Sequence, residues 1–225
     1  MTVFSWHGDV DTMMSPYDSM AYIKKVLMAG FIAVQPESGH VKAWVGGINH
    51  KHFKYDHVNR RARRQVGSTF KPIVYATAID INQMTPCTEF PRERTTFFSG
   101  GQEWSPRNAD GKSGGVWTMS KGLALSDNLI TAQVMKSLGD DAPDIVVKFA
   151  ERVGIEANRI PKVPSICLGT MELSPFEMAS AYSAFANNGL WVEPTFLLRI
   201  EDKNGNILED FNQSKTDQVL SPEKA

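Results

Sequence analysis

A serine and a lysine stand three residues apart at the predicted start of a helix, in the stretch Gly67-Ser68-Thr69-Phe70-Lys71-Pro72. Positions i and i+3 of a helix lie on the same face, so the amine of Lys71 can reach the hydroxyl of Ser68 and take its proton. Pro72 is tolerated only near a helix start. Apolar or small side chains then recur at helical spacing, at Phe70, Ile73, Val74, Thr77 and Ala78. The pattern predicts a buried helix whose N-terminus carries Ser68 as nucleophile and Lys71 as base.

The spacing alone has a second interpretation, in which Ser68 caps the helix and Lys71 is solvated. The same spacing occurs in the polar tail as Ser221-Pro222-Glu223-Lys224, where no helical apolar pattern follows. The string at Ser68 also differs from the one at Ser221 in being preceded by Gly67. A glycine beside Ser68 allows another backbone to approach closely.

A second polar motif follows downstream as Ser126-Asp127-Asn128. Ser126 offers a hydroxyl suited to relaying a proton, and Asn128 offers an amide suited to binding a substrate carbonyl. By itself the tripeptide is typical of a polar turn or helix cap. Ser-x-x-Lys, Ser-Asp-Asn and Lys-Thr-Gly together form the recognised motif set of penicillin-binding proteins and class A β-lactamases.

Longer segments make the resemblance specific. Residues 41–47 (Val-Lys-Ala-Trp-Val-Gly-Gly), 59–72, 104–108 (Trp-Ser-Pro-Arg-Asn), 124–128 and 174–179 resemble, in order, the transpeptidase domain of a class A penicillin-binding protein. The resemblance runs from about residue 20 to residue 200 and implies an α+β fold of the penicillin-binding protein/serine β-lactamase type, with an antiparallel sheet and a helical subdomain.

The resemblance also implies an activity and a set of site residues. The expected enzyme is a peptidoglycan D,D-transpeptidase that forms a serine acyl-enzyme with D-Ala-D-Ala stem peptides, cross-links them and is inhibited by β-lactams. Its catalytic residues would be Ser68, Lys71 and Ser126, and Asn128 would bind substrate. No metal or cofactor is expected.

Partners and location follow from the same resemblance. We expect stem peptides and β-lactam antibiotics as ligands, and an upstream glycosyltransferase domain in the full-length protein. The location would be extracytoplasmic, with membrane attachment only through an anchor outside this chain, because no stretch of it reads as a span or signal peptide. A formal net charge of −1 gives no electrostatic argument for a nucleic-acid partner.

One motif departs from the set, because Lys-Thr-Gly does not occur in the chain. The nearest string, Lys215-Thr216-Asp217, has Asp where the strand needs Gly for close backbone approach, and we interpret Lys215 as a solvated loop residue. We therefore expect an incomplete domain without that strand. Two alternatives stay open: a serine β-lactamase, although Glu-x-x-Leu-Asn is absent, and a β-lactam-sensing or non-catalytic structural module of the same fold.

The organisation predicted along the chain has two parts: residues 1–30, a linker strand and helix, and residues 31–225, a partial transpeptidase domain. Capping and spacing predict helices at 16–29, 129–138, 142–153 and 175–188. Hairpins are expected for 31–34 with 41–45 and for 196–200 with 207–208. The Pro- and Gly-rich residues 86–117 show no sustained period and are expected to form a surface loop that walls the site.

The histidines and cysteines give little support for a metal site or for another reaction type. All five histidines precede Ser68 and none has a recognised metal spacing. Two cysteines, Cys87 and Cys167, permit either a disulfide or two free thiols.

Overall fold

The computed structural model describes residues 1–211 and 214–225. Its α-helices are α1 (Pro16–Lys24), α2 (Lys71–Asn82), α3 (Met119–Ala124), α4 (Asn128–Ser137), α5 (Ala142–Arg152) and α6 (Pro175–Ala186). Short 3₁₀ turns lie at η1 (Gly67–Phe70), η2 (Ala157–Arg159) and η3 (Pro164–Leu168).

The described strands pair two at a time, and each pair is antiparallel. The pairs are β1 (Thr2–Val3) with β2 (Val10–Asp11), β3 (Phe31–Val34) with β4 (Val41–Val45), β5 (Arg64–Gln65) with β10 (Glu172–Leu173), β6 (Glu89–Pro91) with β9 (Val116–Thr118), β7 (Phe97–Ser99) with β8 (Gln102–Trp104), β11 (Leu190–Val192) with β14 (Thr216–Gln218), and β12 (Arg199–Glu201) with β13 (Ile207–Asp210).

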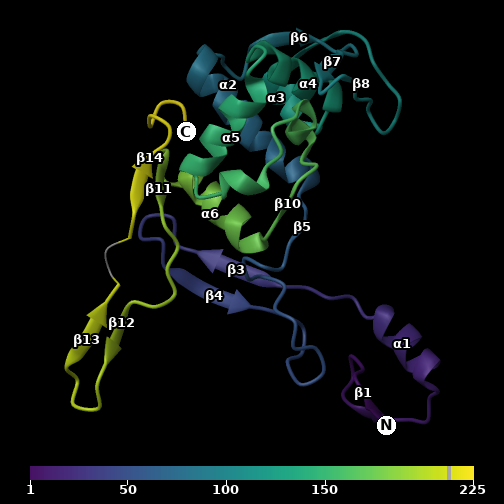
Figure 1. The fold of residues 1–225 in the computed structure, drawn as a ribbon, viewed down its shortest axis with the longest axis vertical. Coiled ribbons are helices and arrows are strands. Elements are labelled where there is room, and N and C mark those ends of the chain that lie inside the picture. The colour runs from purple at the N-terminus through teal and green to yellow at the C-terminus, as the bar shows by residue number, and fades with distance from the viewer. Residues whose placement is uncertain (212–213) are drawn as a thin grey trace.

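Figure 1 shows α2 to α6 gathered into one body, with the β3–β4 hairpin beneath it. The N-terminal segment with α1 lies to one side of that hairpin, and the β12–β13 hairpin projects on the other side. The chain therefore combines a helical body with short antiparallel strand pairs, which confirms the predicted α+β class.

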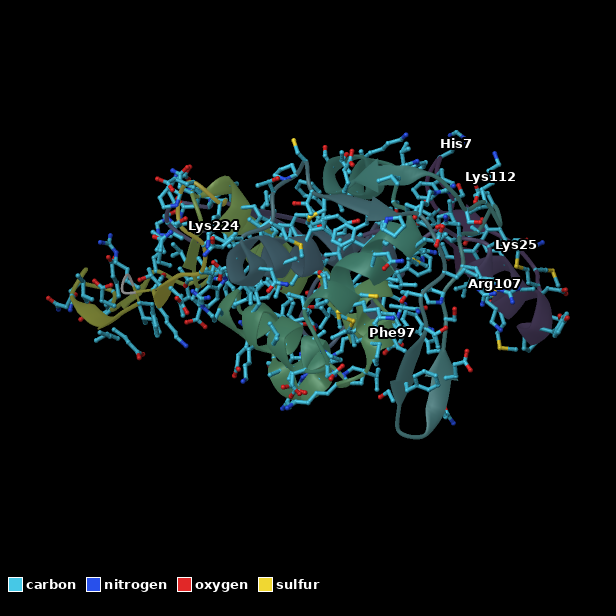
Figure 2. The ribbon with its side chains drawn as sticks, turned by 90° about the horizontal axis from the view of Figure 1, so that it is seen from above. His7, Lys25, Phe97, Arg107, Lys112 and Lys224 are labelled. Carbon is cyan, nitrogen blue, oxygen red and sulfur yellow. The ribbon has the colours of Figure 1, made fainter. Side chains whose placement is uncertain are left out.

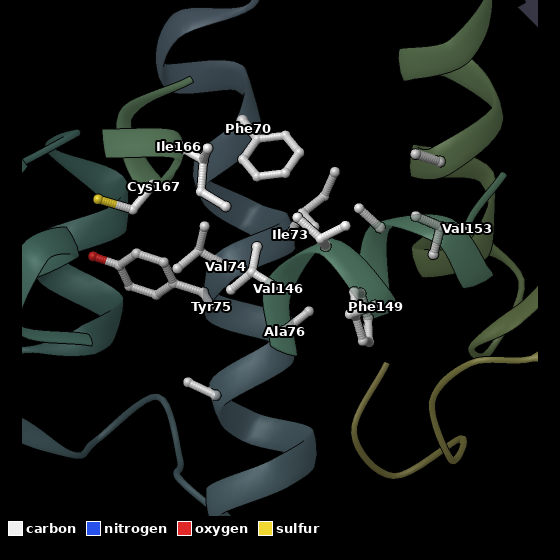
Figure 3. Packing of buried hydrophobic residues seen from close by; sticks show 14 of the residues in the cluster. Phe70, Ile73, Val74, Tyr75, Ala76, Val146, Phe149, Val153, Ile166 and Cys167 are labelled. Carbon is white, nitrogen blue, oxygen red and sulfur yellow. The ribbon is translucent and has the colours of Figure 1, made fainter. Parts of the chain in front are cut away.

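Helix α2 runs through the centre of the hydrophobic core. Ile73 and Val74 of α2 are fully buried, as is Phe70 at the end of η1, and they pack with residues of α5 and η3 such as Val146 and Ile166 (Figure 3). Burial around most of its circumference explains why α2 is the element against which α3, α4 and α5 are packed. The predicted buried helix is confirmed.

The start of α2 differs from the prediction by one turn. Ser68 lies in the preceding 3₁₀ turn η1, and the α-helix begins at Lys71. An α-helical bond to the Ser68 carbonyl would need an N–H at position 72, and Pro72 has none. The Lys71 N–H bonds that carbonyl instead, which is the i to i+3 pattern of a 3₁₀ turn.

Three predicted helices are confirmed within two residues at either end, as α4, α5 and α6. Their starts are set by local capping. Asp127 accepts from the Ile130 N–H at the start of α4, and Ser174 and Glu177 form a reciprocal capping box at the start of α6. The two predicted hairpins are present as β3–β4 and β12–β13, although β12 begins only at Arg199.

Two predictions need correction. The helix expected at 16–29 ends at Lys24, because none of the residues of α1 is buried and no packing carries the helix further. The segment 86–117 contains strands β6, β7 and β8 and the start of β9, each too short to show an alternating pattern. Helix α3 was not anticipated. Lys215 is exposed and lies just before β14, as expected of a loop residue.

The backbone beside Ser68 is held by a contact between two glycines. The Gly67 N–H donates to the Gly169 carbonyl at 2.9 Å, and the Val66 N–H donates to the Met171 carbonyl at 3.1 Å. Gly169 has φ of 70°, and a Cβ there would overlap the carbonyl oxygen of Gly67. Only glycine fits this position without moving the turn that carries Ser68.

We therefore expect Gly169→Ala to destabilise the protein more than Gly139→Ala. Gly139 also has positive φ, at 94°, but a Cβ there would meet nothing within 4 Å. The Gly139 variant should lose about 1 kcal/mol of unfolding free energy from backbone strain. The Gly169 variant should lose a further ~1–3 kcal/mol from the overlap. Urea unfolding of both variants measures this difference, and equal losses would show that the two backbones are not in close contact.

Candidate active site

Ser68 is exposed on the turn η1 and faces a cavity of about 520 Å³. Ser126 and Asn128 line the same cavity. Its remaining wall comes largely from residues 92–117, as predicted for that segment, through Arg92, Asn108, Ala109, Asp110 and Trp117. The structure thus places the predicted nucleophile and two of its predicted partners at one opening.

Lys71 is fully buried at the start of α2, and its amine makes three hydrogen bonds to the Ser-Asp-Asn motif. It donates to the Ser126 carbonyl at 2.6 Å, to Ser126 Oγ at 3.2 Å and to Asn128 Oδ1 at 2.7 Å. Three donated bonds match the three protons of an ammonium group. The two motifs, far apart in the sequence, therefore meet at this amine.

The predicted contact between Ser68 and Lys71 is not made in this structure. Within the described residues, no hydrogen bond joins Ser68 Oγ to the Lys71 amine, whose donors all point to Ser126 and Asn128. Catalytic hydrogen bonds are often absent from ligand-free sites and form when substrate binds. The proton-transfer contact between Ser68 and Lys71 therefore remains a prediction.

The buried position changes the acidity of Lys71. Loss of hydration lowers the pKa of its amine below the ordinary value of 10.5, and the negative charges that Asp127 and Cys167 carry when ionised oppose this effect. Cys167 is itself buried, which raises the pKa of its thiol to about 12 and keeps it neutral at ordinary pH. Burial therefore favours the neutral amine, the form that can accept a proton.

Asp127, the middle residue of the motif, is buried and accepts hydrogen bonds from two side chains that sequence reasoning missed, Arg92 and Asn108. Its carboxylate accepts from Arg92 Nε at 2.6 Å, from Asn108 Nδ2 at 2.8 Å and from the Ile130 N–H at 2.9 Å. Burial opposes ionisation of Asp127, but these hydrogen bonds outweigh it and hold the pKa of the carboxyl below its ordinary value. The charge of Asp127 is thus compensated inside the protein.

Arg92 is positioned by the pairing of β6 with β9. The ladder places Phe90 opposite Trp117 and continues past Pro91, where the Arg92 N–H donates to the Gly115 carbonyl at 2.9 Å. The guanidinium then lies over the Trp117 ring, 4.3 Å from its centroid, and reaches Asp127. The acid at the N-cap of α4 was visible in the sequence, but nothing local indicated its partner 35 residues away.

Asn128 is oriented from both ends of its side chain. Oδ1 accepts from Lys71, and Nδ2 donates to the Arg107 carbonyl at 2.9 Å. Its backbone N–H donates to Asn108 Oδ1 at 2.8 Å, so Asn108 bridges Asp127 and Asn128. One amide proton and one lone pair of Asn128 remain available for a ligand in the cavity.

Ser126 has a strained backbone, with φ of 53°, a region that non-glycine residues rarely adopt. Its N–H donates to the Leu123 carbonyl and the Asp127 N–H to the Gly122 carbonyl, which fixes this conformation at the end of α3. The strain directs both the carbonyl and the hydroxyl of Ser126 to Lys71. Such strain is stored where the surrounding structure over-determines it.

Among the described residues there is no group of three or more His, Cys, Asp or Glu side chains arranged to hold a metal ion. Both cysteines are free, Cys87 exposed and Cys167 buried, so the disulfide alternative is not realised. No helix in the described residues is long and apolar enough to cross a membrane.

Two family profiles match the chain. The profile of the penicillin binding protein transpeptidase domain matches residues 29–225, and that of the penicillin-binding protein middle domain matches residues 1–27. The chain belongs to the penicillin-binding protein transpeptidase family.

Curated relatives include penicillin-binding protein 2D of Bacillus subtilis, 37% identical over 203 residues, which cover 88% of this chain and 28% of the relative. Penicillin-binding protein 1A of Vibrio cholerae is 35% identical over 179 residues, covering 79% of this chain and 21% of the relative. The chain therefore spans about a quarter of the length of these relatives.

Solved structures show the same fold. Penicillin-binding protein 1A from Haemophilus influenzae superposes with a TM-score of 0.74 at 26% identity, covering 84% of this chain and 28% of that one. PonA1 from Mycobacterium tuberculosis, in complex with penicillin V, superposes with a TM-score of 0.71 at 23% identity, covering 88% of this chain and 53% of that one.

We expect Lys71 to titrate below 10.5 and Lys162 above it. Burial lowers the pKa of Lys71, whereas the hydrogen bond and charge of Asp144 raise that of exposed Lys162. Between the lowered pKa and 10.5 the folded state binds fewer protons than the unfolded state, so Lys71 makes stability rise with pH there. NMR of ¹³C-labelled lysine side chains measures both residues in one sample. A Lys71 resonance that titrates at or above 10.5 would contradict the burial described here.

Proposed function

We propose that this chain carries the acylation site of a serine-type D-Ala-D-Ala transpeptidase. Ser68 Oγ attacks the carbonyl of the penultimate D-alanine, the peptide bond to the last D-alanine breaks, and that residue leaves as a free amino acid. An amine of a neighbouring stem peptide then attacks the ester. This step joins the two stem peptides and releases Ser68. The observation that carries the proposal is the buried Lys71 amine bonded to Ser126 and Asn128 beside Ser68.

Each polar side chain has a role that its surroundings support. Lys71, in its neutral form, accepts the proton of Ser68, and burial favours that form. Ser126 passes a proton to the departing amine, since its Oγ already contacts the Lys71 amine at 3.2 Å. Asn128 binds the amide group of the substrate with its free proton and lone pair.

The full-length protein, in this proposal, works outside the cytoplasm, is held at the membrane by an anchor outside this chain and carries a glycosyltransferase domain upstream. Residues 1–30 would lead into the transpeptidase domain, which begins at residue 31. β-Lactams would acylate Ser68 as the D-Ala-D-Ala peptide does. The names of the relatives, penicillin-binding proteins 1A and 2D, support this family-level placement.

In the full-length protein we expect Ser68→Ala to abolish covalent labelling by penicillin and to leave the fold intact, because Ser68 is exposed. Intact-mass spectrometry measures the adduct, and circular dichroism checks the fold. Ser221→Ala, which removes the serine of the other Ser-x-x-Lys string, is the matched control and should label normally. A penicilloyl adduct on the Ser68 variant would refute the assignment.

The rate of penicillin acylation distinguishes the role of Lys71 from that of Asn128. Lys71→Ala should slow penicillin acylation by about 10²- to 10⁴-fold through loss of the base. Asn128→Ala should slow it less, because that change mainly misplaces the ligand. Second-order rate constants from stopped-flow labelling give the order. The reverse ranking would mean that Lys71 serves structure and that Asn128 carries the larger part of catalysis.

A further inference from the structure

The turn η1 that carries Ser68 is joined to the rest of the protein partly through its backbone. Gly67 and Val66 donate their N–H groups to the carbonyls of Gly169 and Met171. Glycine has the least conformational restraint of any residue, and Gly67 directly precedes the nucleophile. The orientation of Ser68 therefore depends also on the contacts of the residue that follows it.

The same turn borders a cavity of about 540 Å³ whose wall is largely apolar. Val66 and Thr69 line it from the side of the turn, and Met178, Ala179 and Tyr182 line it from α6. A space of this size means that the turn and the helix are not closely packed against each other here. A polar contact between the two elements would therefore have a large part in fixing the turn to the helix.

The hydroxyl of Tyr182 makes such a contact. It donates to the carbonyl of Thr69 at 2.6 Å, across 113 residues of sequence. This distance is at the short end of the range for a hydroxyl donor. The Thr69 hydroxyl in turn donates to the Val66 carbonyl at 2.7 Å, so both the side chain and the backbone of Thr69 are held. Tyr182 thus bonds the backbone that directly follows the nucleophile.

Helix α6 gives Tyr182 a rigid support. The helix belongs to the helical body, which Figure 2 shows between the β12–β13 hairpin at one end and α1 at the other. Phe176, Ala181 and Ala184 of α6 are buried. The Tyr182 ring meets the Phe185 ring edge to face, with the two centroids 5.8 Å apart. The ring therefore has a defined orientation, from which its hydroxyl reaches the turn.

The Tyr182 hydroxyl also keeps its proton. Partial burial raises the pKa of this hydroxyl above its ordinary value of 10.0. A neutral tyrosine can donate to a carbonyl, whereas a phenolate cannot. Ionisation of Tyr182 therefore does not break the bond to Thr69 near neutral pH.

We propose that Tyr182 is a positioning residue for the acyl transfer, whose hydrogen bond to the Thr69 carbonyl keeps Ser68 Oγ directed into the cavity that Ser68 shares with Ser126 and Asn128. The proposal rests on the transpeptidase function and adds a residue of α6 to it. Tyr182 acts through the turn, and its hydroxyl takes no part in the bonds that form and break. Displacement of the nucleophile lowers the rate, because the reacting atoms must lie about 3–3.5 Å apart.

Tyr182→Phe in the full-length protein tests this role, because it removes the hydroxyl and keeps the ring beside Phe185. Stopped-flow labelling at several penicillin concentrations separates the first-order acylation constant from the dissociation constant of the initial complex. We expect the first-order constant to fall about fivefold, the scale of one hydrogen bond, and the dissociation constant to stay unchanged. A residue that served stability alone would lower the melting temperature and leave both constants of the folded protein unchanged.

Ser183→Ala is the matched control, because it removes the next hydroxyl of α6, which donates to the Ser180 carbonyl of the same helix at 2.7 Å. Its first-order constant should match that of the unmodified protein. An unchanged constant in Tyr182→Phe, an equal fall in Ser183→Ala, or a change confined to the dissociation constant would overturn the proposal. Each of these results comes from a protein that penicillin still labels, so the function stands, whereas absent labelling of the unmodified protein refutes the function itself.

Discussion

The buried ion pair between Arg92 and Asp127 is the interaction on which the candidate site depends. It joins the β6–β9 ladder to the start of α4 at 2.6 Å, and Asn108 adds a second bond to the same carboxylate. Removing one partner of such a pair typically costs about 3–5 kcal/mol, because the other charge is left buried and unpaired. The pair does little for general stability compared with an apolar core, but it fixes one conformation of residues 126–128.

That conformation explains how a lysine can be buried at a site open to water. Lys71 extends from the start of α2 to the Ser-Asp-Asn motif. Its amine donates hydrogen bonds there to the carbonyl of the strained Ser126 and to the Asn128 side chain. The hydrogen bonds satisfy the amine in its charged form, while burial lowers its pKa and favours the neutral form. Burial therefore shifts Lys71 toward the neutral form, which is the form that the proposed general base needs.

Local patterns predicted the parts of this structure that depend on neighbours in sequence. The α2 core positions, the caps of α4 and α6, and the β12–β13 hairpin all follow from patterns within a few positions of the sequence. The α1 helix was predicted too long, because periodicity cannot tell whether an apolar face has a partner, and α1 has no buried residue. Motifs predicted Ser68, Lys71, Ser126 and Asn128 as site residues. The structure places three of them at one cavity and the Lys71 amine against two of them, whereas their catalytic roles remain predictions. Arg92 and Asn108 were missed as parts of the site, since their contacts with Asp127 span 35 and 19 residues.

The most direct measurement is the behaviour of Lys71 and Ser68 in an Asn108→Ala variant. This change removes the bonds that Asn108 makes to Asp127 and to the Asn128 N–H without altering any charge. If the polar network holds the motif against Lys71, the folded variant should show a Lys71 pKa closer to 10.5 by NMR and slower penicillin acylation of Ser68. An unchanged Lys71 titration together with an unchanged acylation rate, in a folded variant, would contradict this dependence and leave the network without a role in the site.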